Sequence, residues 1–237
     1  MTHKHQKIAF VLALLFAPGV HAQVAAHNSQ PRQVPLLPRD LEIELALSAA
    51  PAHLRNGATV LVLEPGGFVK AKEGTNKFTC IVTRAGGDVF PVCYDEEGTR
   101  SVLPVDFDDV KLRMQGLSTS EVDRQIAEGY KSGLYRAPSR PGISYMLSPI
   151  RYKIDEQGHI VKNTPNPHMM FYAPYLSDAD IGGVRGSGAF INQVGPHGMM
   201  IVPVGKTERE TILKESQGLT EKIEHLIRYT APATGGQ

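Results

Sequence analysis

The sequence lacks the short motifs by which many enzyme classes are recognised. It contains no Gly-x-Ser-x-Gly nucleophile elbow, no Ser-x-x-Lys and no His-Glu-x-x-His. A glycine-rich stretch runs from 182 to 188, without the Gly-Lys-Ser/Thr ending of a P-loop or the Gly-x-Gly-x-x-Gly spacing of a dinucleotide site. No specific activity is therefore indicated by a motif, and both an enzyme and a binding protein stay open.

The chain also has little excess charge and few long apolar runs. It carries 25 Lys and Arg against 24 Asp and Glu, a formal net charge of +1. A dedicated nucleic-acid-binding protein normally shows a basic excess on one face. Beyond the N-terminal region, no apolar stretch approaches the roughly 20 residues that a helix needs to cross a bilayer. We expect no nucleic-acid partner and no transmembrane segment in the mature chain.

Cysteine is rare, and tryptophan is absent. The two cysteines, Cys80 and Cys93, are too far apart in sequence for the Cys-x-x-Cys spacing of redox-active thiols. Gly86-Gly87-Asp88 lies midway between them and is typical of a hairpin turn. The pattern predicts two adjacent strands joined by a structural disulfide, Cys80–Cys93, in an oxidising compartment.

The first 22 residues have the order of a secretory signal peptide. A basic start with Lys4 and Lys7 is followed by the apolar run Ile8–Phe16 and then by small residues ending at Ala22. The apolar run is too short to span a membrane, and a short buried helix is the alternative. We expect cleavage after Ala22 and a periplasmic or extracellular location. No cysteine follows this site, so no lipid anchor is expected there.

The remaining chain suits one folded domain between two irregular segments. We predict a signal peptide at 1–22, a flexible Pro- and Gln-rich leader at 23–38, a single domain at 39–230 and a disordered tail at 231–237. Loss of the signal peptide removes two lysines and no acid, which changes the formal net charge from +1 to −1.

The periodicity of apolar and turn residues predicts an α+β fold. Asp40 is expected to cap a first helix, Ser118 and Glu121 to form a capping box, and Gly218 to interrupt the last helix. The elements are expected in this order: a helix at 41–50, an antiparallel meander at 59–94, a helical pair at 104–116 and 119–133, a second antiparallel sheet at 143–204, and a C-terminal helix at 208–227.

A near-repeat is the most distinctive feature of the second half. Pro-His-Met-Met-Phe-Tyr at 167–172 resembles Pro-His-Gly-Met-Met-Ile at 196–201. If both are neighbouring strands, His168, Met170, His197 and Met199 could converge. Imidazole and thioether are ligands for copper, and imidazole is also a ligand for zinc. Methionine as core filler, or a small-molecule or general-base role for the imidazoles, stays open.

Two carboxylates lie between the repeats. Asp178 and Asp180 alternate like the start of a calcium loop, but the twelfth position is Ala189 rather than Glu, so an EF-hand is excluded. They remain candidate ligand residues, while the cap of a short turn is the alternative for Asp178. Ser144 or Ser187 could still join a histidine and one of these carboxylates in a Ser–His–Asp arrangement.

Four stretches resemble an uncharacterised family of small exported bacterial proteins: GTNKFTCIV, PVCYDEEG, RPGISYMLSP and PHMMFYAPYL. The resemblance implies export and a shared fold, and it supplies no catalytic residue. We expect a non-enzymatic binding or interaction module whose partner is a small molecule or an envelope protein. The alternative is a metal-dependent or hydrolase-like enzyme centred on His168 and His197.

Overall fold

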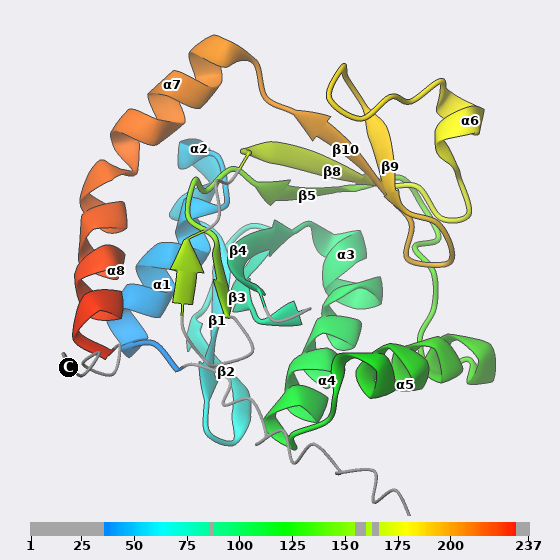
Figure 1. Cartoon of the computed structure of the whole chain (residues 1–237), viewed down its shortest axis with the longest axis horizontal. Coiled ribbons are helices and arrows are strands. Elements are labelled where there is room, and N and C mark those ends of the chain that lie inside the picture. Colours follow the sequence, from blue (N-terminus) through cyan, green and yellow to red (C-terminus); the bar gives the residue numbers. More distant parts are fainter. Residues whose placement is uncertain (1–35, 86–87, 155–159, 163–165, 231–237) are drawn as a thin grey trace, which may run out of the picture.

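A computed structural model describes residues 36–85, 88–154, 160–162 and 166–230. The predicted signal peptide, most of the leader and the tail at 231–237 lie outside the described residues. Within them, a sheet is packed between helices, which confirms the α+β class (Figure 1). No helix in this part of the chain is long and apolar enough to cross a membrane.

The predicted meander and the predicted second sheet form one continuous sheet, because β4 pairs with β5. The β1–β2 hairpin places β2 at an edge, and β3 then returns to the other side of β1. That return makes β1–β3 a parallel pair, whereas only antiparallel pairs were expected. The main path runs in the order β2 (Gly67–Lys72), β1 (Thr59–Glu64), β3 (Thr79–Thr83), β4 (Asp88–Tyr94), β5 (Ile143–Met146), β8 (His168–Tyr172), β10 (Met199–Pro203) and β9 (Phe190–Gln193), with β6 (Tyr152–Ile154) between β4 and β7 (Ile160–Lys162).

Helices cover both faces of the sheet (Figure 1). One face packs against α1 (Arg39–Ser48) and α8 (Gln217–Thr230), and the other against α3 (Glu96–Ser101) and α4 (Leu103–Met114), with α5 (Thr119–Ser132) beside α4. Side chains alternate between these faces along each strand. Val60 and Val62 therefore enter the first core, while Ile81 and Val92 enter the second. Three shorter or peripheral helices complete the fold: α2 (Ala52–Arg55), α6 (Asp178–Ile181) and α7 (Lys206–Glu215).

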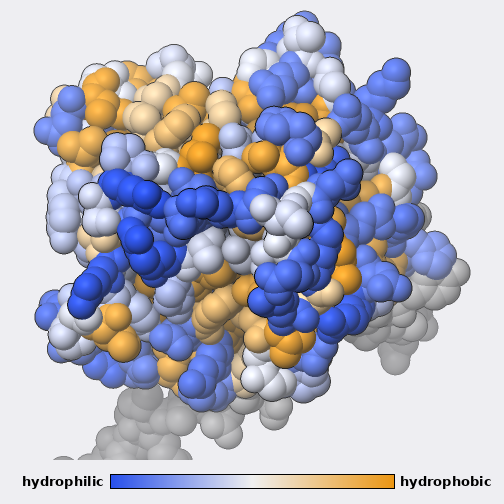
Figure 2. Space-filling model, turned by 180° about the vertical axis from the view of Figure 1, so that it is seen from behind, coloured by the Kyte–Doolittle hydropathy of each residue, from blue (hydrophilic) through white to orange (hydrophobic). Residues whose placement is uncertain are grey.

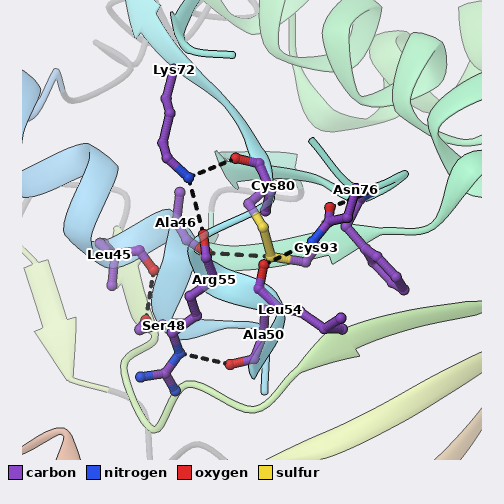
Figure 3. The surroundings of a disulfide bond; sticks show 12 residues. Leu45, Ala46, Ser48, Ala50, Leu54, Arg55, Lys72, Asn76, Cys80 and Cys93 are labelled. Carbon is purple, nitrogen blue, oxygen red and sulfur yellow. Dashed lines mark hydrogen bonds between the residues drawn. A yellow bond between two sulfur atoms is a disulfide. The ribbon is translucent and has the colours of Figure 1, made fainter. Parts of the chain in front are cut away.

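The disulfide joins β3 to β4, as predicted. Cys80 lies directly opposite Cys93, with a Cα–Cα distance of 4.0 Å, and both residues are buried. The Sγ atom of Cys93 lies 3.6 Å from the carbonyl oxygen of Ala46 in α1 (Figure 3). Nearby, Lys72 donates to the carbonyl of Arg55 at the end of α2. The disulfide therefore lies in the core between sheet and helices, and it fits a protein that folds in an oxidising compartment.

A buried ion pair lies on the same side of the sheet. Glu42 of α1 is 0% exposed and Arg84, at the end of β3, is 1% exposed. Both terminal nitrogens of Arg84 donate to the Glu42 carboxylate, at 2.8 and 2.9 Å. The backbone amide of Leu63 in β1 donates to the same carboxylate at 2.8 Å. This pair links α1, β1 and β3 in a place where water is excluded.

The helical pair agrees with its local signals. The Ser118 hydroxyl accepts a hydrogen bond from the Glu121 amide at 3.3 Å, and α5 ends at Gly133 in the left-handed conformation, with φ of 80°. The Glu121 carboxylate bonds to Arg124 and Gln125 instead of returning to Ser118. One half of the predicted capping box is therefore present.

Two local expectations were wrong. The first helix starts early, after Pro38, so Asp40 lies within its first turn, where it faces the positive end of the helix dipole instead of capping it. The C-terminal helix breaks at Ser216, and Gly218 lies in the first turn of α8, where a glycine is tolerated. After β4, Asp95 caps the helix α3 by accepting a hydrogen bond from the Gly98 amide at 2.9 Å.

Candidate functional site

The two strands of the near-repeat are neighbours, which was the condition for convergence, but their histidines do not meet. In the antiparallel β8–β10 pair, His168 lies opposite Pro203, while Tyr172 lies opposite Met199. In an antiparallel pair the starts of the two strands lie at opposite ends, so the histidine at the start of each repeat is far from the other. The length of β8, roughly 13 Å between its first and last residues, sets the scale of this separation. His197 lies beyond the far end of that pair, in the turn before β10.

The two methionines named in the repeat do share a face. Met170 lies opposite Ile201, and Met199 lies opposite Tyr172, which directs all four side chains to the face covered by α3 and α4. Met199 is buried in that core, and Met170 packs against it. Met199 therefore fills space in the core, which was one of the alternatives for these methionines.

Asp178 and Asp180 bond within their own loop and do not approach the histidines. Asp178 Oδ1 accepts from the Ile191 amide at 2.5 Å, and the Ile191 carbonyl accepts from Arg185 at 3.3 Å. Asp180 accepts from the amide and hydroxyl of Ser177, at 2.8 and 2.6 Å, and these bonds lower the pKa of Asp180. The two carboxylates therefore hold α6 and the edge strand β9 in place.

The Ser–His–Asp arrangement is not assembled. The Ser144 hydroxyl is buried in β5 without a hydrogen-bond partner among the described residues. Ser187 lies in the exposed loop after α6 and donates to the carbonyl of Val184 at 3.2 Å. Neither hydroxyl reaches an imidazole.

His168 lines an open groove of about 190 Å³, which we call the His168 groove. The side chain of His168 lies on the same face of the sheet as that of Met170, two residues further along β8. Its walls come from β4, β5, β8, β9 and β10 and from the segments that flank them. Most of the lining is apolar. The lining residues are Phe90, Pro91, Met146, Ser148, Ile150, Arg151, Asn166, His168, Phe190 and Ile201.

The hydrogen bond of His168 fixes its tautomer. Nδ1 lies 2.6 Å from the backbone carbonyl oxygen of Asn166. A carbonyl only accepts, so Nδ1 carries the proton and Nε2 carries a lone pair. Burial lowers the pKa of His168 and the charge of Arg151 adds to this effect, while the hydrogen bond to Asn166 opposes it; the net direction favours the neutral imidazole. Nε2 has no hydrogen-bond partner among the described residues.

Arg151 lines the groove and forms an ion pair with Asp88. It donates to Asp88 Oδ2 through Nε, at 3.1 Å, and through one terminal nitrogen. Its guanidinium also stacks 4.9 Å from the centre of the Phe90 ring. The carboxylate offsets the cation, and the ring fixes its position.

His197 belongs to a second cluster, between α5 and the β9–β10 turn. Its ring stacks on Tyr130 with a centroid distance of 5.3 Å. The Nδ1 atom of His197 and the hydroxyl of Tyr130 are both buried without a partner in the part of the chain that the structure describes. Burial and the charge of Asp106 raise the pKa of Tyr130 to about 12.

Asp106 extends this cluster into the core. Its carboxylate accepts a hydrogen bond from the Tyr94 hydroxyl, and burial raises the pKa of Asp106 to about 7. Neither Tyr94 nor Tyr130 was singled out, because the contact between α5 and a distant turn has no local signal.

Apolar side chains are exposed around α6. In Figure 1, α6 and β9 lie at the upper right. Figure 2 shows the molecule from behind, so this region is at the upper left there, where apolar residues are gathered on the surface. Tyr175 is 68% exposed and has a φ of 67°, a left-handed conformation that is uncommon for a tyrosine. Leu176, Val184 and Val194 are the other large exposed apolar residues of this region.

The described residues contain no group of three or more His, Cys, Asp or Glu side chains placed to hold a metal ion. Comparisons with protein-family models, with curated proteins and with solved structures give no match to this chain. The function is therefore argued from the geometry of the His168 groove and of the cluster around His197.

Proposed function

We propose that the protein is an exported, non-enzymatic binding module of the periplasm or cell exterior, and that the His168 groove is its ligand site. The observation that carries the proposal is the Nε2 lone pair of His168, which lines an open, largely apolar groove and has no partner among the described residues. A ligand that supplies a donor or a metal ion would satisfy it.

The size of the groove restricts its ligand. A volume of about 190 Å³ lies below the roughly 300–1,000 Å³ of typical drug-sized pockets. The apolar walls favour a compact apolar body, and the rim offers Arg151 and Asn166 as polar contacts. An enzyme centred on both His168 and His197 has less support, because the two imidazoles belong to separate clusters.

Benzoate is a suitable probe of the groove, since its ring matches the apolar walls and its carboxylate can reach Arg151. In an NMR titration, we expect benzoate to shift amide signals of the groove-lining residues. Ile201→Phe fills the groove and should weaken this binding about tenfold. Val202→Phe is the matched control, because Val202 faces the opposite side of the same strand and should leave binding unchanged. Shifts confined to other surfaces would refute the assignment of the groove.

Export is tested separately. When residues 1–237 are expressed in a bacterial host, we expect the periplasmic product to begin at Gln23 and to have the mass of the oxidised Cys80–Cys93 form. Ala22→Lys removes the small residue before the cleavage site and should prevent processing. Recovery of full-length protein with free thiols from the cell interior would contradict export.

A further inference from the structure

A thioether lies beside the imidazole of His168 on the floor of the groove. Met146 of β5 is directly opposite His168 of β8, and both residues line the groove. Side chains of directly opposite residues point to the same face, with Cβ atoms about 4.5–5.5 Å apart. Met146 lies outside the near-repeat, so the sequence pattern did not suggest this neighbour.

A second thioether follows on the same face. Met170 lies two residues after His168 in β8 and opposite Ser144 in β5, which makes it the diagonal neighbour of Met146. Diagonal neighbours lie about 7–8 Å apart, within reach of long side chains. Methionine has three rotatable bonds and adapts its sulfur position easily. One imidazole and two thioethers therefore occupy adjacent positions on one face of the sheet, and two of the three residues, His168 and Met146, line the groove.

His168 is already oriented as a metal ligand. Metal-bound histidines almost always donate their other ring N–H to a carbonyl, a carboxylate or water, which fixes the ring and its tautomer. The Nδ1–H bond of His168 to the Asn166 carbonyl, at 2.6 Å, is such an arrangement. It leaves Nε2 as the donor atom for a metal in the groove.

We propose that the His168 groove binds one Cu(I) ion through Nε2 of His168 and the thioether sulfurs of Met146 and Met170. The inference rests on the proposed function, because it names the ligand of that groove. Soft thioether donors select Cu(I) over Zn(II), for which thiolate, imidazole or carboxylate ligands are usual. All three donors are uncharged, which suits a monovalent ion. Asp88 pairs with Arg151 and so reduces the positive charge that a bound cation would face.

Competition with the Cu(I) chelator bicinchoninate, under anaerobic conditions with ascorbate, tests the site on the exported, oxidised protein. We expect one equivalent of Cu(I) per chain and preference over Zn(II). Met146→Leu, Met170→Leu and His168→Ala should each weaken binding about tenfold or more. Leucine nearly conserves the volume of methionine, so the fold should survive. Met200→Leu, on the opposite face of β10, should leave Cu(I) affinity unchanged.

Ag(I), a redox-inert analogue of Cu(I), gives a second readout by NMR of methionine methyl groups labelled with carbon-13. We expect Ag(I) to shift the methyl signals of Met146 and Met170 and to leave that of Met200 in place. Equal copper affinity in the wild type and in all three ligand variants would overturn the proposal, as would the absence of Cu(I) binding. Benzoate binding without Cu(I) binding would reject copper alone, whereas failure of both probes would also reject the groove as a ligand site.

Discussion

Glu42→Gln is expected to lower the free energy of unfolding by about 3–5 kcal/mol. The substitution keeps the size of the side chain but removes the charge that balances Arg84. Because Arg84 is 1% exposed, its guanidinium would remain in the core without the charge of Glu42 and with little access to water. Urea unfolding at neutral pH, followed by circular dichroism, measures the change.

A matched control lies two residues further along the same helix. Glu44 is exposed and pairs with Lys222 at 2.8 Å, so Glu44→Gln should cost no more than about 1 kcal/mol. The double substitution Glu42→Leu with Arg84→Met replaces the buried pair by apolar groups and should recover much of the lost stability. If Glu42→Gln and Glu44→Gln lowered the free energy of unfolding by equally small amounts, the charge of Glu42 would not be needed to stabilise the buried Arg84, and the prediction would be wrong.

Removal of the disulfide is the second large effect. Cys80 and Cys93 are 13 residues apart, and the chain-entropy model gives about 3 kcal/mol for closing a loop of that length. The combined substitution Cys80→Ala with Cys93→Ala should therefore lower the free energy of unfolding by at least that amount, since both sulfurs also fill buried space. Urea unfolding of the oxidised wild type and of the double variant provides the comparison.

Two further observations check the cause of this effect. The wild type unfolded in the presence of a reductant should lose most of the same stability, because only the cross-link is removed. In the oxidised protein, whether folded or denatured, thiol alkylation should label neither cysteine until a reductant is added. A double variant as stable as the oxidised wild type would show that the cross-link contributes nothing.

Features set by neighbouring residues could be predicted from the sequence. The β3–β4 pairing that carries the disulfide was predicted from the sequence between Cys80 and Cys93, whose Gly86 and Gly87 lie outside the described residues, and the start of α5 from Ser118 and Glu121. Both signals act within a few residues or across one turn. The α+β class followed because it requires only the types of the elements and their order.

Features set by long-range pairing could not be predicted. The β1–β3 and β4–β5 pairs depend on the path of the chain across the sheet, and no local residue encodes that path. The near-repeat suggested that His168 and His197 converge, but the antiparallel register separates them. The pairing of β8 with its other neighbour, β5, brings Met146 to His168 across 22 positions of sequence. Glu42 and Arg84, 42 positions apart, also carry no sequence signal for their pairing.

The bonds of Asp178 and Arg185 to Ile191 have a consequence for how copies of the protein behave at high concentration. An outermost strand with unpaired peptide groups is a template on which other chains can polymerise. At Ile191 in β9, both peptide groups are already held by side chains of the same molecule. A foreign strand would have to displace a carboxylate and a guanidinium before it could add to the sheet there, so the loop around α6 serves as a built-in barrier against fibre growth.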